Sequence, residues 1–344
     1  MSRPGGDRRR VWVMAAAVLG ALGAALLATF VGPAGLPPRG VLLALADGLP
    51  GIDVDHGLTA SQHAVLWQIR LPRVVLGALV GGTLAIAGAA YQGVFRNPLA
   101  DPYLLGVSSG AGLGATAVIV SGLAASTFAV PVAAFAGGIL AVTATYLLGR
   151  GVGGGRTEVV IILAGVAVAA FANAGQTFLQ QRYDESMRQV YSWLLGRLST
   201  DGWSEVGVAL PYVVSTIVVI LLFARILDVM AVGDTEAASL GVDPGRVRLL
   251  LVAVATLGTA AVVSVSGLIG FVGIVVPHAV RLVVGPGHRL LLPLSVLFGA
   301  AFLMLADVLA RTVMAPAELP IGVVTAAIGA PFFLVVLRRS RRLP

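Results

Sequence analysis

The sequence predicts an all-α, polytopic membrane protein with about ten transmembrane helices. Of its 344 residues, 58% are hydrophobic and only 11% are charged, whereas soluble domains carry about 25% charged residues. The mean hydropathy is +0.95. Apolar runs long enough to cross a hydrocarbon core of about 30 Å recur along the whole chain. These observations exclude an ordinary soluble domain.

The apolar runs define the expected helices in chain order. They lie at about 11–31, 71–93, 103–123, 127–149, 158–181, 204–227, 249–266, 268–284, 290–311 and 320–337. The first run follows a basic segment, and its length and the lack of an A-x-A cleavage site favour an uncleaved span over a signal peptide. In the third run Gly106, Gly110 and Gly114 recur every four residues, which predicts close helix packing.

The arginines predict the orientation of these helices. The chain has no lysine, and all 23 of its basic residues are arginine. With the N-terminus in the cytoplasm, 16 arginines lie inside and 7 outside, as the positive-inside rule requires. An even number of spans then places both tails, 1–10 and 338–344, in the cytoplasm. The net charge of +7 follows from topology and does not indicate nucleic-acid binding.

Residues 1–344 contain no linker, charge block or low-complexity segment, so one membrane domain is expected. The absence of cysteine excludes disulfides and thiolate metal sites, and the four histidines show no metal-ligand spacing. No metal site and no cofactor are therefore expected in this chain. The segment 150–157, RGVGGGRT, lacks the lysine of a phosphate-binding loop, so ATP and Mg²⁺ would be bound by a partner ATPase.

The segment 233–248, GDTEAASLGVDPGRVR, is polar and lies between two apolar runs. Gly241 and the Asp243-Pro244 pair predict two short helical pieces, with Asp243 as an N-cap and Pro244 in the first turn. Short surface helices contribute nothing to membrane insertion. They are typical of a surface that a soluble partner binds, although a solvated turn is the plainer alternative.

Polar residues in the fifth run share one helical face. Asn173, Gln176, Thr177 and Gln180 follow the spacing i, i+3, i+4, i+7. Buried amides are costly in lipid, so this stripe is expected to face protein or water. Hydrogen bonding between helices and a translocation pathway are both compatible with it.

One ionisable pair lies in a predicted span. Asp307 and Arg311 are four residues apart, so they can neutralise each other on one helix. A proton relay in an ion-coupled secondary transporter is the alternative interpretation. An intramembrane enzyme is a remote one, because no nucleophile–base or metal constellation is present.

A long, ordered set of motifs resembles the FecCD/BtuC-type permease family, the membrane subunits of type II ABC importers for iron-siderophores, haem and cobalamin. The resemblance is carried by RLPRVVLGALVGGTLAIAGAAYQGVFRNPLADPYLLGVSSGAGLGA at 70–115, SGLIGFVGIVVPHAVRLVVGPGHRLLLP at 266–293 and LADVLARTVMAPAELPIGVVTAAIGAPFFLVVLRR at 305–339. It implies a ten-helix subunit in which helices 2–5 and 7–10 form an inverted repeat. The implied partners are a second copy of the chain, two ABC ATPase subunits, an extracytoplasmic substrate-binding protein and membrane lipid.

The resemblance also implies roles for particular residues. ATPase coupling is implied for Asp234, Glu236, Ala237, Leu240, Gly241, Arg246 and Arg248. A binding protein would dock on Arg70, Arg73 and Arg311, with interfacial snorkelling as the alternative. The translocation pathway would include Asn173, Gln176, Thr177 and Gln180, and the cytoplasmic gate Asn97, Pro98, Leu99, Thr157, Glu158 and Val159. Family members often carry small hydroxyl residues at the second gate segment, where this chain has Glu158 and Val159.

The expected function is that of a non-enzymatic permease subunit in the cell (inner) membrane. It would form a homodimeric pathway for a large metal-chelate cargo, with ferric siderophore as the first candidate and cobalamin or haem as alternatives. An ion-coupled secondary transporter remains the rival class.

Overall fold

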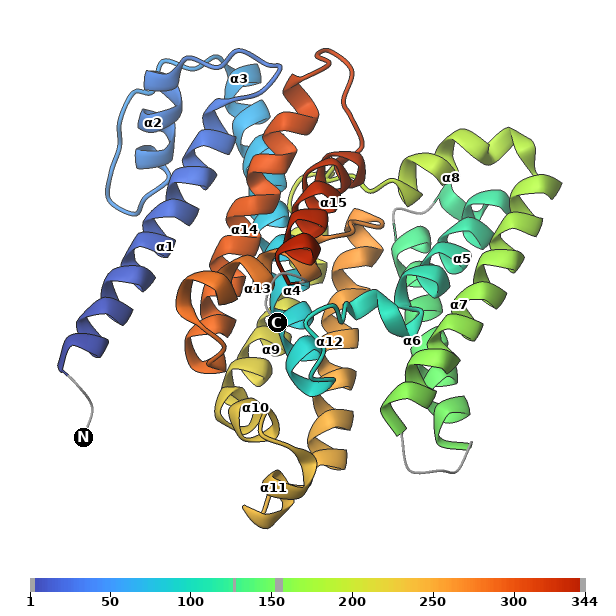
Figure 1. Cartoon of the computed structure of the whole chain (residues 1–344). Coiled ribbons are helices and arrows are strands. Elements are labelled where there is room, and N and C mark those ends of the chain that lie inside the picture. The colour runs from blue at the N-terminus through green and yellow to red at the C-terminus, as the bar shows by residue number, and fades with distance from the viewer. Residues whose placement is uncertain (1–3, 126–127, 152–156, 341–344) are drawn as a thin grey trace.

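A computed structural model describes residues 4–125, 128–151 and 157–340 of the chain (Figure 1). Within these residues the structure consists of helices and their connections, without strands. Elements α2, α3 and α8 lie at one end of the bundle and α11 lies at the other (Figure 1). We call these the α8 end and the α11 end.

The helices follow the apolar runs of the sequence. The first half contains α1 (Pro4–Phe30), α2 (Pro38–Asp47), α3 (Ala60–Ala64), η1 (Val65–Arg70), α4 (Leu71–Val94), η2 (Pro102–Leu105), α5 (Val107–Val120), η3 (Leu123–Ala125), α6 (Ala129–Gly151) and α7 (Thr157–Arg182). The second half contains η4 (Asp184–Ser186), α8 (Met187–Leu194), α9 (Ser204–Leu222), α10 (Ala224–Met230), α11 (Asp234–Ser239), α12 (Pro244–Ser266), α13 (Val272–Val284), α14 (His288–Thr312) and α15 (Ile321–Ser340).

Seven helices of the described residues are long and apolar enough to cross a membrane. Three further apolar segments are shorter, namely α5, α13 and the Ile321–Val336 part of α15. All ten expected runs are thus helical, and the number of full crossings stays a prediction. The 204–227 run is divided at Phe223 into α9 and α10, and α1 begins at Pro4, inside the segment expected to be a tail.

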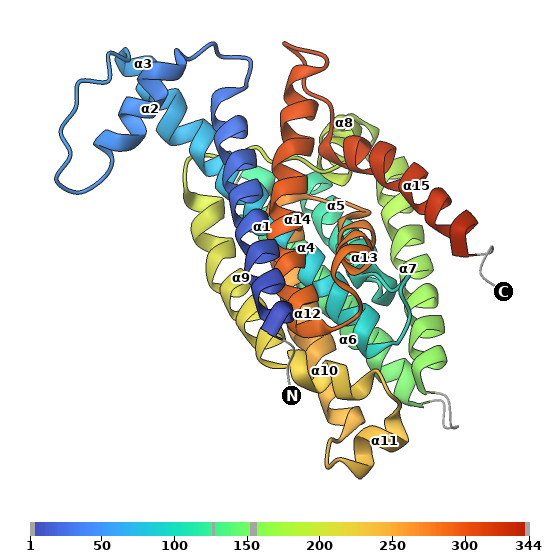
Figure 2. The ribbon, with the colours of Figure 1, turned by 60° about the vertical axis from the view of Figure 1, so that its left-hand side comes forward.

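Helix α4 is the centre of the bundle. Nineteen of its 24 residues are buried, and α9, α12, α13 and α14 pack around it (Figure 2). Glycines make this close packing possible. A methyl group at Gly81 would overlap the carbonyl oxygen of Gly299 in α14, and one at Gly88 would overlap the backbone of Gly273 in α13. A helix with such contacts on several faces must be glycine- and alanine-rich, as the sequence of α4 is.

The glycine repeat of the third run has two structural roles. Gly110 and Gly114 lie against the backbone of α6, where a Cβ would overlap Gly137 and Ala133. The predicted close packing is therefore confirmed for these two. Gly106 instead has φ +85° and precedes the first turn of α5, a conformation that favours glycine.

Two short helices, α5 and α13, each follow an interruption of helical geometry. The residue before α5 is Gly106, and the residue before α13 is Phe271 with φ +69°. Tyr103 connects the two interruptions, because its hydroxyl lies 3.1 Å from the carbonyl oxygen of Ile269. Non-helical backbone at this depth is therefore bonded within the protein, as a membrane interior requires.

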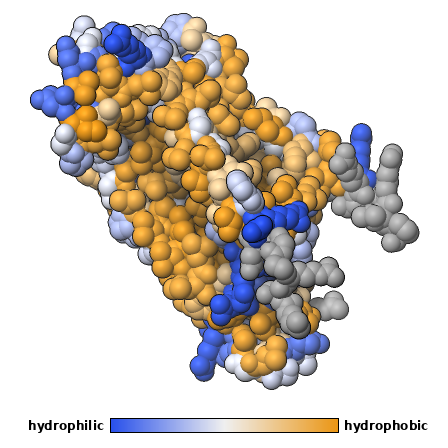
Figure 3. Space-filling model, turned by 90° about the vertical axis from the view of Figure 1, so that its left-hand side faces the viewer, coloured by the Kyte–Doolittle hydropathy of each residue, from blue (hydrophilic) through white to orange (hydrophobic). Residues whose placement is uncertain are grey.

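The surface of the bundle is apolar along most of its length. In Figure 3, hydrophobic residues cover the middle of the visible face, and hydrophilic residues gather toward its ends. Large exposed apolar side chains also occur on several of the long helices, such as Leu19 of α1, Leu163 of α7 and Leu222 of α9. Large exposed apolar surfaces of this kind mark contact with lipid or with another chain.

Candidate functional site

The polar segment 233–248 forms the extreme α11 end of the bundle (Figure 1). Within α11, Ala237 is fully buried, while Glu236 is exposed. Two large apolar side chains are also exposed there, Val232 at 70% and Leu240 at 69%. Leucine and valine beside charged groups at the tip of a membrane protein form a surface suited to a protein partner.

Asp234 holds this segment to the rest of the bundle. Its two carboxylate oxygens form ion pairs, one with Arg96 at 3.2 Å and the other with Arg248 at 3.1 Å. Arg96 follows α4, and Arg248 lies in the first turns of α12. One carboxylate therefore joins α11 to two other segments. Asp234 and Arg248, both expected to contact an ATPase, are engaged within the chain itself.

The second half of the segment differs from the expectation. Asp243 is the N-cap, and its side chain accepts from the amide of Arg246 at 3.1 Å, as predicted. However, the helix that begins at Pro244 is not a short separate piece, because it continues as α12 to Ser266. No residue after Pro244 disrupts helical geometry, so the cap starts a long helix. The Arg246 side chain is 89% exposed and pairs with Asp243 at 3.1 Å.

The first gate segment is a compact turn at the α11 end. Asn97 stabilises it, since its side-chain oxygen accepts from the amide of Leu99 at 2.9 Å. Pro98 and Leu99 are exposed. Arg96 connects this turn to α11 through Asp234. In the second gate segment, Val159 is exposed, and the side chains of Thr157 and Glu158 lie outside the described residues.

The polar stripe of α7 is divided between two environments. Gln176 is 9% exposed and lies against α5, where a Cβ at Gly112 would be 2.8 Å from its side-chain oxygen. Asn173 and Thr177 are exposed, and Gln180 is half-buried. The Thr177 hydroxyl donates to the carbonyl of Asn173 at 2.9 Å. Helix packing thus accounts for Gln176, and Asn173 and Thr177 remain available to a pathway or a second chain.

Two of the three arginines expected to dock a binding protein are buried at the α8 end. Arg70 and Arg311 are each 3% exposed. Arg70 donates to the carbonyls of Thr29 at 3.0 Å and Phe30 at 3.2 Å, and Arg311 donates to that of Ala28. These carbonyls close α1, so the guanidinium groups cap its C-terminus. Docking on them stays a prediction, but in this structure both side chains are directed inward.

Arg73 lies between two carboxylates. It donates to Asp307 at 2.8 Å and to Glu318 at 2.9 Å. Asp307 is buried and also pairs with Arg311 at 3.4 Å, which confirms the predicted i, i+4 pair. The side chain of Glu318 is 44% exposed. The charged group that this cluster presents to the surface is therefore acidic.

Sequence reasoning missed several of these residues. Arg96 has φ +47° at the end of α4, and Glu318 lies in a loop, so neither stands out in a helical pattern. Asp228 of α10 was also missed. Its carboxylate accepts from the backbone amide of His288 at 2.7 Å and contacts the ring of the same residue at 2.8 Å, so that it caps α14 from another helix. Among the described residues, no group of three or more metal-ligating side chains is present.

An all-helical bundle with an apolar girdle, two polar ends and interrupted internal helices defines a membrane transport subunit. The chain belongs to the FecCD transport family, whose sequence model matches residues 18–339. It is a multi-pass inner-membrane permease of the ABC transporter type and is not itself an enzyme.

Several characterised proteins resemble the chain along most of their length. The cobalamin import system permease protein BtuC of Halobacterium salinarum is 44% identical over 304 residues, covering 88% of this chain and 80% of that protein. The hemin transport system permease protein HmuU of Yersinia pestis is 41% identical, covering 82% and 86%. The Fe(3+) dicitrate transport system permease protein FecD of Escherichia coli is 36% identical, covering 93% and 96%.

A solved structure also resembles the chain. It is described as the inward-facing conformation of a metal-chelate type ABC transporter. Its TM-score is 0.83 at 28% identity, covering 95% of this chain and 99% of that one.

Proposed function

We propose that this chain is the permease subunit of an ATP-driven importer for an organic metal chelate. Two copies would enclose the pathway, two ABC ATPase subunits would bind at the α11 end, and a substrate-binding protein would bind at the α8 end. The α11 end would be cytoplasmic, because Arg96, Arg246 and Arg248 all lie there. ATP and Mg²⁺ would be held by the ATPase.

The observation that carries this proposal is the exposed surface of the α11 segment. Val232, Glu236 and Leu240 are exposed at the tip of the bundle, and Ala237 is the buried residue of α11. This surface is held in place by the ion pairs of Asp234. A rigid, exposed short helix that presents both apolar and charged side chains is suited to the cleft of a soluble ATPase.

The pathway would lie where the helices are interrupted. Short helices in corresponding positions of two halves are typical of transporter binding regions, and in the expected inverted repeat α5 and α13 would be such a pair. We propose that they, with the exposed Asn173 and Thr177 of α7, face the pathway in the dimer. The Asn97 turn would form part of the cytoplasmic gate, and its link to α11 through Arg96 would connect gate and ATPase.

The cargo class is supported by the relatives, which are named for cobalamin, hemin and ferric dicitrate. These cargoes share a metal held in an organic ligand. The polar stripe of α7, Asn173, Gln176, Thr177 and Gln180, carries no charge, which suits a bulky complex that must pass without being trapped. Ferric siderophore is our first candidate, and the absorption spectrum of the cognate binding protein purified with its cargo distinguishes the three classes.

An ion-coupled transporter is the rival function, and the environment of Asp307 argues against it. This carboxylate is bound by two arginines, Arg73 at 2.8 Å and Arg311 at 3.4 Å. Both ion pairs are internal to the chain, so the carboxylate is already occupied by protein groups and not by a transported ion. Concentrative uptake by liposomes containing the permease alone, driven by an ion gradient, would show that the rival is correct.

The coupling role is tested by co-purification with the ATPase. Glu236→Arg reverses an exposed charge and is expected to reduce the recovered ATPase severalfold without changing the melting temperature of the permease. Asp234→Asn removes the ion pairs with Arg96 and Arg248 and tests the internal attachment of α11 separately. Unchanged ATPase recovery with both variants would argue against coupling through this segment.

A further inference from the structure

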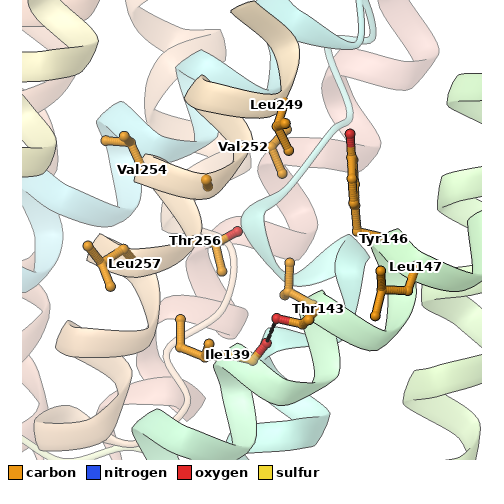
Figure 4. A pocket seen from close by; sticks show the side chains of 11 residues that line it. Ile139, Thr143, Tyr146, Leu147, Leu249, Val252, Val254, Thr256 and Leu257 are labelled. Atoms are coloured by element: carbon orange, nitrogen blue, oxygen red, sulfur yellow. Dashed lines mark hydrogen bonds between the residues drawn. The ribbon is translucent and has the colours of Figure 1, made fainter. Parts of the chain in front are cut away.

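A lateral groove separates α6 from α12 in the half of the bundle nearer the α11 end (Figure 4). Its volume is about 410 Å³, within the range of about 300–1,000 Å³ typical of small-molecule sites. Tyr146 and Leu147 from α6 face Leu249, Val252 and other α12 residues across it. The remaining lining residues are Ile139, Val142, Thr143, Ala253, Val254, Thr256 and Leu257.

The hydroxyls of the two threonines that line the groove bond within the protein. The Thr143 hydroxyl donates to the carbonyl of Ile139 in its own helix at 2.8 Å, as the dashed line in Figure 4 shows. The Thr256 hydroxyl bonds to Tyr91 at 2.8 Å. Both hydroxyls are thereby satisfied. The groove lies at membrane depth on two membrane-spanning helices, so its occupant must be apolar along this length.

The α11-end mouth of the groove is basic. The guanidinium of Arg150, exposed at the last turn of α6, lies 5.4 Å from the centre of the Tyr146 ring. Tyr146 lines both the groove and a smaller adjoining cavity, which Arg248 also lines. Arg248 is held in an ion pair with Asp234. The exposed guanidinium of Arg150 at this mouth therefore favours an anion.

We propose that the groove is a binding site for one acyl chain of an anionic phospholipid, with its phosphate at Arg150 and its glycerol near Tyr146. An apolar slot ending in arginine matches an acyl chain that ends in a negative headgroup. Zwitterionic lipid would fit the slot equally well but gains less from Arg150. The site lies beside the first turns of α12 and the Asp234 ion pairs, so the lipid would support the packing of α11. The proposal does not depend on the transport role of the chain.

Native mass spectrometry tests this directly. The purified permease is titrated with dioleoylphosphatidylglycerol or dioleoylphosphatidylethanolamine in mixed micelles, and bound lipid is counted. We expect the phosphatidylglycerol to bind about fivefold more tightly, and Arg150→Gln to remove most of that preference. The matched control is Arg289→Gln, an exposed arginine outside the groove, which should leave the preference unchanged.

A second variant tests the slot itself. Ala253 is exposed and lines the groove, so Ala253→Trp fills it and is expected to remove one tightly bound lipid of either headgroup. Ala136→Trp adds the same side chain at an exposed position of α6 outside the groove and should not remove it. If Ala253→Trp prevents folding, Leu257→Trp replaces it.

Three outcomes would overturn the proposal. The first is equal affinity for the two lipids. The second is equal behaviour of the Arg150 and Arg289 variants. The third is a change in the monomer–dimer ratio rather than in bound lipid on filling the groove, which would assign this face to a second copy of the chain.

Discussion

Tyr103 and Ile269 form a reciprocal pair in which one hydroxyl bonds to both polar backbone atoms of the partner. The hydroxyl oxygen lies 3.1 Å from the carbonyl oxygen of Ile269 and 3.3 Å from its amide nitrogen. The pair joins the interruption before α5 to the interruption before α13. Backbone groups that no helix satisfies are therefore satisfied by a side chain from the other half of the chain.

Removing this hydroxyl should loosen both interruptions. Tyr103→Phe leaves the Ile269 carbonyl and amide without these partners, at a cost of about 1–3 kcal/mol, and should lower the melting temperature by several degrees. The matched control is Tyr212→Phe, which keeps the contact of this ring with Phe135 and should leave the melting temperature unchanged. Equal melting temperatures for both variants would show that the pair contributes nothing to stability.

The buried carboxylate at the α8 end should be essential for folding. Asp307→Asn leaves the guanidinium groups of Arg73 and Arg311 without their shared counter-charge, and we expect a loss of about 3–5 kcal/mol. The yield of monodisperse protein and its melting temperature report this loss.

Glu318→Gln is the companion measurement for the same cluster. Glu318 contacts Arg73 at 2.9 Å, but its side chain is 44% exposed, so the expected cost is only about 0–1 kcal/mol. A larger effect at Glu318 than at Asp307 would contradict the assignment of the buried pair as the stabilising one.

The packing of α4 should tolerate no methyl group at Gly88. A Cβ there would overlap the backbone of Gly273, and two helix backbones cannot both move aside in a tightly packed bundle. Gly88→Ala is therefore expected to abolish most of the folded protein, measured by size-exclusion chromatography. Gly23→Ala places the same methyl group in open space on α1 and should give a normal yield.

Leu240 should be a binding anchor rather than a structural residue. It is 69% exposed at the end of α11, so Leu240→Asp should leave the melting temperature unchanged and weaken ATPase binding about tenfold or more. Thr235→Asp introduces the same charge elsewhere on α11. Equal loss of binding from the two variants would indicate a general charge effect instead of a pocket for the leucine.

The helical framework was predictable from hydropathy because lipid requires long apolar helices. The inward direction of Arg70 and Arg311 was not, since the carbonyls that they bind belong to the last turn of α1 and the loop after it, far away in sequence. The pattern around Pro244 predicts a helix start correctly. It does not indicate the length of the helix that follows, which depends on the absence of a later break.

The candidate site was predictable as segments but not as contacts. The polar segment 233–248 stands out because its composition differs from that of its neighbours. Its attachment through Arg96 was not predictable, because it requires a left-handed residue at the end of α4 to direct a side chain toward α11. Periodicity likewise identifies the α7 stripe but does not separate the packed Gln176 from the exposed Thr177.

The carboxylate of Asp234 connects α11 to two separate parts of the bundle, α12 and the turn after α4. A displacement imposed on α11 must travel along α12 through Arg248 and, at the same time, into the turn at Asn97 through Arg96. The first branch reaches the middle of the bundle as a continuous helix, and the second leads toward the interruption before α5. One displacement of α11 would thus be transmitted both through a continuous helix and through the turn that follows α4.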